Sequence, residues 1–281
     1  KYSYLENDSI ICVTYDNENP RNYKLMISFD GKTFNKIDDL NLEGWDYCLA
    51  YNNGYYYLCY DYMSDDFVSS NYPYFTGGNK IAILKTKDFL EFEKISVTLD
   101  NNIKQTWGPE LFFHNNKWHI LFSGSDLTDT SVDIDGTTQY IKNTYYMSSD
   151  NLLDWSTPVK LNLNNDYGNK LDPSIIEVNG TFHLFLKNED GKYIEHYTST
   201  SINGTYTLVN TLKDRYFVEA PSVCYFNGIY YLYCDMYATG IYIYYTSTDL
   251  INWSKSNILS TSDNSVMRHF TPCKVYNKQL L

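Results

Sequence analysis

The chain repeats itself. A strand, a two-residue turn and an aromatic strand recur at residues 46–58, 108–121, 172–185 and 220–233, aligned on Asn-Gly or Asn-Asn turns. Such dipeptides between apolar runs predict β-hairpins. A shorter motif occurs five times, near residues 28, 86, 148, 199 and 247, where a Ser or Asp side chain can satisfy the amides of a tight turn. These periods indicate repeated units that each form one small sheet.

The fifth hairpin is divided between the two ends of the chain. Residues 269–277 read as a lone inner strand, and residues 9–38 supply strands that would otherwise lack a partner. Pairing them closes a ring and removes an exposed sheet edge. The sequence therefore predicts an all-β fold: a five-bladed β-propeller, one domain spanning residues 1–281, closed by pairing the N-terminal strands with the C-terminal strand.

The composition of the chain limits the classes of partner that it can bind. The net charge of −12 argues against nucleic acid and against an anionic membrane surface. No apolar run approaches the roughly 18 residues needed to span a bilayer. Thirty tyrosines suit both strands and flat contact surfaces. The six cysteines show no CxxC pairing and lie in apolar runs, so we expect buried thiols rather than metal ligands or disulfides.

Positions that break the repeat are candidates for function. Superposing the hairpin blocks places Trp45, Trp107, Leu171 and Glu219 at one position, and Asp46, Gly108, Asp172 and Ala220 at the next. Three acids thus stand at the starts of three inner strands, which surround the mouth of a propeller's channel. A carboxylate in such an apolar run must be paired, protonated or placed on a wet wall. Two long loops, 62–80 and 123–144, are expected to wall the cleft.

These motifs resemble family 43 of the glycoside hydrolases over essentially the whole chain. The similarity is carried by "LDPS" at Asp172, "VEAP" at Glu219, "WGPE" at residues 107–110 and "MRHF" at residues 267–270. Tyr47, Ala220 and Phe270 depart from the family pattern, which has Pro, Gly and Gly at these places.

The resemblance implies a role for each acid. Asp46 corresponds to the general base, Asp172 to the residue that tunes the acid, and Glu219 to the general acid, with Glu43 as an alternative base. An inverting glycosidase needs such a protonated acid and an ionised base on opposite faces of the sugar. We expect Asp172 to raise the pKa of Glu219. The alternative for Glu219 is a structural ion pair with Arg215 or Arg268.

Further residues are expected to bind substrate. Trp45 and Trp107 offer flat faces for a sugar ring. Arg268 is expected to contact substrate or orient Asp172, and His269 to lie near the channel centre, where the family can hold a water or a hydrated calcium ion. No other cofactor is implied. His119 and His183 are read as structural, and the acidic loop 126–136 as a solvated loop, because it lacks the full calcium-loop spacing.

The leading function is hydrolysis of arabinose- or xylose-containing plant polysaccharides or oligosaccharides, with an α-L-arabinofuranosidase ahead of an endo-arabinanase or β-xylosidase. A non-catalytic carbohydrate-binding propeller is the alternative of a different class. Fructan- and sialic-acid-active enzymes fit less well, because the fructan start motif and a cluster of three arginines are missing. A polysaccharide substrate favours secretion, whereas unpaired cysteines favour a reducing compartment.

Overall fold

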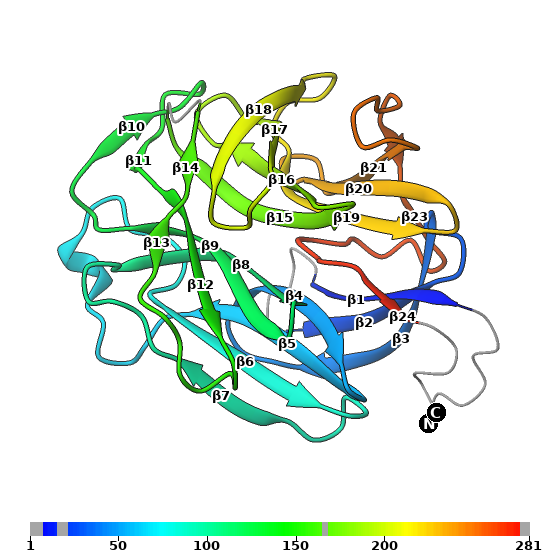
Figure 1. The fold of residues 1–281 in the computed structure, drawn as a ribbon, viewed down its shortest axis with the longest axis horizontal. Coiled ribbons are helices and arrows are strands. Elements are labelled where there is room, and N and C mark those ends of the chain that lie inside the picture. Colours follow the sequence, from blue (N-terminus) through cyan, green and yellow to red (C-terminus); the bar gives the residue numbers. More distant parts are fainter. Residues whose placement is uncertain (1–7, 16–21, 165–167, 276–281) are drawn as a thin grey trace.

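The computed structural model describes residues 8–15, 22–164 and 168–275. Its sheets follow one another in chain order around a common centre (Figure 1). They form a five-bladed β-propeller, as predicted. Among the described residues, no helix has the length and apolar character needed to cross a membrane.

Four blades are continuous in sequence, and each runs from an inner to an outer strand. Blade 1 contains β4 (Trp45–Asn52), β5 (Tyr55–Tyr62), β6 (Lys80–Thr86) and β7 (Glu93–Val97). Blade 2 contains β8 (Gln105–His114), β9 (Lys117–Ser125), β12 (Asn143–Ser149) and β13 (Val159–Lys160). Blade 3 contains β15 (Lys170–Val178), β16 (Thr181–Asn188), β17 (Tyr193–Ser199) and β18 (Thr205–Leu212). Blade 4 contains β19 (Glu219–Phe226), β20 (Ile229–Met236), β21 (Ile241–Ser247) and β22 (Asn257–Ile258).

Blade 5 joins both ends of the described chain. β24 (Cys273–Val275) pairs antiparallel with β1 (Ser9–Thr14), which is followed by β2 (Asn22–Ser28) and β3 (Thr33–Asn41). Two short strands extend outer edges in parallel, β14 (Asn162–Leu163) on β18 and β23 (Ser260–Thr261) on β3. Each of these comes from the segment that leaves the preceding blade, so neighbouring blades are joined at their outer edges as well.

The core is divided into five apolar clusters, one between each pair of adjacent blades. Between blades 5 and 1, for example, Val13 and Leu25 pack with Leu49 and Leu58. The other four clusters continue around the ring in the same way. All six cysteines are buried thiols, as predicted. Burying both faces of each sheet in this way is the main stabilising term of the fold.

Both repeated turns have the local chemistry expected. The hairpin turns at Asn53–Gly54, Asn115–Asn116, Asn179–Gly180 and Asn227–Gly228 have positive φ at both residues, the type I′ geometry that matches strand twist. In the shorter motif a Ser or Thr hydroxyl accepts the amide three residues on, as Thr86 does from Phe89 and Ser247 from Leu250.

The long loop after β9 forms a hairpin. β10 (Thr130–Val132) pairs with β11 (Thr138–Tyr140), and Asp133 between them is buried and bound to Lys192 of blade 3 at 2.7 Å. Most of residues 126–136 are exposed, as expected of a solvated loop, but the ion pair of the buried Asp133 fixes the loop against blade 3. The loop after β5 contains the short 3-10 helix η1 (Ser69–Asn71), and its Tyr74 makes an edge contact with Tyr140 of the hairpin.

Candidate active site

The inner strands of blades 1 to 4 share a bulge at their starts. The strand register shifts after Trp45, Trp107, Leu171 and Glu219. The next residue has positive φ in every case: Asp46 53°, Gly108 49°, Asp172 53° and Ala220 50°. Bulges of this kind re-aim side chains and increase local twist. Blade 5 repeats the geometry, because Arg268 bridges Tyr15 and the following His269 has φ 28°.

Two rings of five residues therefore surround the propeller axis. The first ring is Trp45, Trp107, Leu171, Glu219 and Arg268. The second is Asp46, Gly108, Asp172, Ala220 and His269. A cavity of about 390 Å³, called here the central cavity, is lined by Tyr15, Trp45, Asp46, Gly77, Trp107, Leu171, Asp172, Glu219, Arg268 and His269. All seven residues selected from the sequence thus line one cavity.

Asp172 is held by its neighbours in blades 2 and 4. Its amide donates to the Ser123 hydroxyl at 3.1 Å, and its Oδ2 accepts the Ala220 amide at 2.9 Å. Gly108 lies so close that a Cβ there would stand 2.8 Å from Asp172 Oδ1. Burial raises the pKa of Asp172 to about 6, with the negative charge of Glu219 adding to the effect and His269 opposing it.

Asp46 forms an ion pair with His269, whose Nδ1 lies 3.2 Å from Asp46 Oδ1. Burial raises the pKa of Asp46 and His269 opposes this. The pKa of His269 rises despite its burial, because Asp46, Asp172 and Glu219 all favour the imidazolium. Glu43, the alternative base, is paired with Lys94 instead and does not line the central cavity.

Glu219 lies between two cations. Its Oε2 is 3.1 Å from Lys187 Nζ and its Oε1 is 3.0 Å from Arg268 Nη2, with 20% of the side chain exposed. Burial acts to raise the pKa of Glu219, but Lys187, Arg268 and His269 outweigh it and the pKa is lowered. The expectation of a raised pKa was therefore wrong for the ligand-free site, and the ion pair with Arg268 that was weighed as an alternative is present.

Arg268 is directed to Glu219 rather than to Asp172. Its Nε donates to Asp235 Oδ2, while Nη2 donates to Glu219. Burial and the charge of Glu219 raise the pKa of Asp235 to about 7. Arg215, the other cation considered for Glu219, donates to Ser256 at the surface.

Sequence reasoning missed the second-strand residues that face the first ring. Strand register pairs Trp45 with Asp61, Trp107 with Ser123, Leu171 with Lys187 and Glu219 with Asp235. All four are buried, and three of them are ionisable. The signal was present in the sequence, because an ionisable residue recurs at one position of an otherwise apolar aromatic strand.

The departures from the family motifs are accommodated by packing. Tyr47 is buried and stacks on Tyr60 with ring centroids 4.7 Å apart. Phe270 is buried and stacks on Tyr242 at 4.5 Å. His119 and His183, read as structural, are bound to Tyr146 and His196 away from the central cavity.

The surroundings of His269 do not fit a directly bound metal. Asp46 occupies its Nδ1, and its raised pKa favours an imidazolium, which repels cations. Within the described part of the chain, no group of three or more His, Cys, Asp or Glu residues could hold a metal ion.

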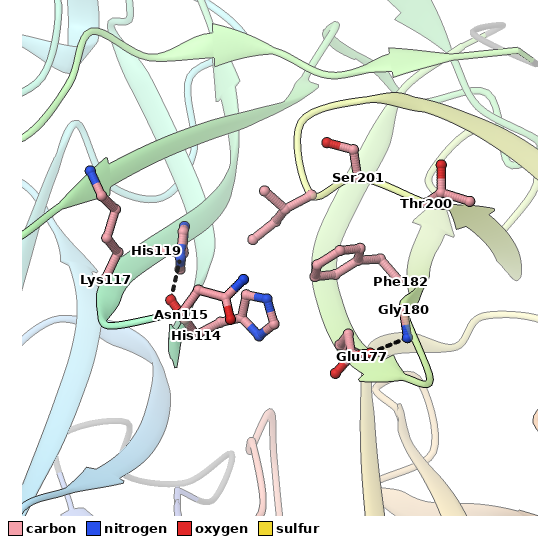
Figure 2. A pocket seen from close by; sticks show the side chains of 10 residues that line it. His114, Asn115, Lys117, His119, Glu177, Gly180, Phe182, Thr200 and Ser201 are labelled. Carbon is pink, nitrogen blue, oxygen red and sulfur yellow. Dashed lines mark hydrogen bonds between the residues drawn. The ribbon is translucent and has the colours of Figure 1, made fainter.

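A second cavity, of about 550 Å³, lies between the hairpin turns of blades 2 and 3. Figure 2 shows His114, Asn115 and Lys117 on one side and Glu177 and Phe182 on the other. It lies at the opposite end of β8 from Trp107, roughly 20 Å along the strand. Its one carboxylate, Glu177, accepts the Gly180 amide, so it lacks the paired acids of the central cavity.

Comparison with known proteins agrees with this architecture. A family model described as "Probable glycosyl hydrolase domain", related to glycosyl hydrolase family 43, matches residues 50–280. An exo-β-1,3-galactanase from Clostridium thermocellum is similar in structure, with a TM-score of 0.61 and 15% identity over 78% of this chain and 49% of the other. An α-L-arabinofuranosidase from Lactobacillus brevis gives a TM-score of 0.58 and 18% identity over 82% and 73%.

A family 43 protein from Bacillus licheniformis gives a TM-score of 0.55 and 18% identity over 76% of this chain and 41% of the other. The chain spans about half the length of the galactanase and less of the Bacillus protein. No curated protein sequence matches. The family match covers most of the chain and includes the starts of the inner strands of blades 2 to 5. The chain belongs to the family 43-related glycosyl hydrolases.

Proposed function

We propose that this protein is an inverting glycoside hydrolase of arabinose- or xylose-containing plant polysaccharides or oligosaccharides, with α-L-arabinofuranosidase activity. The observation that carries the proposal is the gathering of Asp46, Asp172 and Glu219, from three blades, in one cavity also lined by Trp45 and Trp107. Inverting hydrolysis of a glycosidic bond uses two carboxyl groups, one on either side of the sugar.

Asp46 is the proposed base. The imidazolium of His269 favours its ionised form, so it can accept a proton from a water whose oxygen then bonds to the anomeric carbon. Glu219 gives its proton to the glycosidic oxygen as the bond from that oxygen to the anomeric carbon breaks. The products are a sugar of inverted configuration and a free alcohol, and the net proton transfer runs from water to the leaving group.

The protonation states predict an acidic optimum. Turnover needs Glu219 protonated and Asp46 ionised, but the pKa of Glu219 is lowered while that of Asp46 is raised. Above the higher of the two values, the competent fraction falls about tenfold per pH unit. We expect kcat/KM to peak below neutral pH and to decline toward pH 8. An optimum above pH 8 would contradict this assignment of roles.

The role of Glu219 is tested by Glu219→Gln. The amide cannot donate a proton to the leaving oxygen, so we expect a loss of about 10²–10⁴-fold in kcat on oligosaccharides. Aryl arabinofuranosides and xylosides should be affected less, because their leaving groups need less protonation. Glu43→Gln is the matched control and should retain activity. Undiminished turnover by Glu219→Gln would remove the assignment.

The sugar is identified by product analysis on arabinan, arabinoxylan, xylo-oligosaccharides and β-1,3-galactan. An exo-β-1,3-galactanase is a second candidate, supported by the structural likeness to the Clostridium enzyme at a TM-score of 0.61. Proton NMR of the first-formed anomer tests inversion. Sugar binding without release of reducing ends would indicate a non-catalytic binding module instead. A hydrated calcium ion near His269, held through water rather than by direct ligands, stays a prediction, tested by activity after chelation.

A further inference from the structure

Glu219 is the end of a buried chain of alternating charges. Lys187 Nζ contacts Glu219 at 3.1 Å and Glu189 at 2.5 Å, and Lys192 Nζ contacts Glu189 at 2.8 Å and Asp133 at 2.7 Å. Apart from Glu219, the four side chains are each less than 10% exposed. Water therefore screens these contacts weakly. We call these five residues the charge chain.

The chain crosses from the central cavity to the loop hairpin. Lys187 lies on β16, and Glu189 follows directly after this strand. Asp133 lies between β10 and β11, whose Gln139 also donates to Glu189 at 2.9 Å. The hairpin that borders blade 3 is thus linked to Glu219 through two lysines.

Lys187 cannot be released to water. A buried cation that loses its partner is strongly destabilising. If Glu219 alone balanced Lys187, protonating Glu219 would leave the ammonium group without a counter-charge. Glu189 prevents this, because it remains as the closer partner when Glu219 takes up a proton.

We propose that Lys187 is a positioning residue for Glu219, and that Glu189, by sharing the ammonium group of Lys187, sets how firmly Glu219 is held. Lys187 and Arg268 donate hydrogen bonds to different oxygens of Glu219, which fixes the plane of the carboxyl group. Glu189 weakens the hydrogen bond from Lys187 to Glu219, so that Glu219 can change its protonation state during a catalytic cycle. This inference depends on the proposed function in one respect only, namely that Glu219 donates its proton to the glycosidic oxygen.

Other charges facing Glu219 are unchanged by variants of the charge chain. The ionisable groups that interact with Glu219 are Lys187, Arg268, His269, Asp46, Asp172, Asp235, Tyr15 and Tyr237. Two of these groups are shared with a carboxylate that does not line the central cavity, Arg268 with Asp235 and Lys187 with Glu189. Altering Glu189 therefore changes the hold on Glu219 without touching the cavity wall.

The test is a direct titration of Glu219 in the full chain. Protein labelled with ¹³C at the glutamate carboxyl groups is followed by NMR, and the Glu219 resonance is assigned by its absence from Glu219→Gln. Lys187→Met removes an attractive cation, so the apparent pKa of Glu219 should rise by about 1 unit or more. Glu189→Gln leaves Lys187 with Glu219 as its remaining charged partner, so the pKa should fall.

Opposite shifts are the distinguishing result, because a general loss of packing would not move one group in both directions. Glu195→Gln is the matched control: Glu195 is as deeply buried in blade 3 and pairs with Lys170 at 2.7 Å, but it does not line the central cavity. It should leave the Glu219 titration unchanged. If Lys187→Met does not fold, Glu189→Gln alone decides the question.

If the pKa of Glu219 is unchanged or raised in the Glu189→Gln variant, the proposal is overturned. The experiment needs no substrate, so its failure is distinct from that of the glycosidase assignment. Inactivity on all glycosides with opposite pKa shifts would remove the assignment and leave the charge chain intact. Titrations that do not shift, together with hydrolysis that depends on Glu219, would overturn the charge-chain proposal and leave the glycosidase assignment intact.

Discussion

At the scale of single residues, the second ring is set by backbone conformation. Positive φ costs an ordinary residue roughly 1–2 kcal/mol, and Asp and Gly tolerate it best. The ring contains Asp46, Gly108 and Asp172 at such positions, but also Ala220 and His269. The strain at the last two is maintained by the bulge geometry, which aims their neighbours Glu219 and Arg268 into the central cavity.

Gly108 offers a test of this geometry. A Cβ added there would lie 2.8 Å from Asp172 Oδ1 and 3.1 Å from Asp172 Cα, at a φ of 49° that disfavours side chains. Gly108→Ala should displace Asp172 and lower kcat/KM by about 10²-fold, the cost of a misplacement near 1 Å. Gly136→Ala is a control, because nothing lies within 4 Å of its added Cβ, although its φ of 87° carries similar strain. Equal activity of the two variants would contradict the role given to Gly108.

The residues of the candidate site could be selected from the sequence, but the electrostatics of the site could not be predicted. Asp46, Asp172 and Glu219 break a visible repeat, and the family resemblance names the same residues. Lys187 and Asp235 lie on second strands, where alternation alone cannot tell a buried ionisable side chain from a surface one. Their effect on the pKa of Glu219 depends on distances of about 3 Å, which only a folded chain defines.

At the scale of elements, the short turn motif works by local hydrogen bonding. Ser247 accepts the amides of Asp249 at 3.2 Å and Leu250 at 2.9 Å, and Leu250 has φ 64°. The hydroxyl thus offsets the strain of a left-handed leucine that is buried in the core. The same chemistry explains why this motif could be read from sequence five times: it needs no distant partner.

Ser247→Ala should destabilise the protein without affecting turnover. It leaves the buried Leu250 amide without its acceptor, at a cost of about 1–2 kcal/mol in the free energy of unfolding. Urea denaturation measures this loss. Ser260→Ala, at an exposed position, should change the free energy by less than about 0.5 kcal/mol. A Ser247→Ala variant as stable as wild type would show that the turn does not depend on this hydroxyl.

The loop hairpin marks the limit of prediction at this scale. β10 and β11 pair over three residues each, too few for alternation to reveal. Their stability comes from Asp133 and Gln139, which bind Lys192 and Glu189 of blade 3. Long-range ion pairs of this kind leave no periodic signal, so a run of acids looks the same whether it is solvated or docked.

At the scale of the whole molecule, the blades close into a ring because no blade can bury both of its apolar faces alone. Each sheet has two apolar faces, and each needs a neighbour on either side to bury them. The five clusters between blades satisfy this requirement all the way around, including across the junction of the chain ends. The number of blades could be counted from the turn motif because each blade contributes one copy. The parallel strands β14 and β23 could not, since they are two residues long.

The buried His196 is expected to make the stability of the whole molecule sensitive to acid. His196 is buried in blade 3, stacked on Phe185, with its Nε2 3.0 Å from His183 Nδ1. Burial and the charge of a protonated His183 lower the pKa of His196 to about 3. A histidine with a depressed folded pKa contributes stability that is present above its unfolded pKa of about 6.5 and is lost as the pH falls toward 3. Unfolding free energies from urea titrations at pH 7.5 and pH 4.5 should therefore fall by about 2 kcal/mol more in wild type than in His196→Phe. Carboxyl groups common to both proteins cancel in this comparison, so a difference that does not depend on pH would show that His196 does not carry the effect.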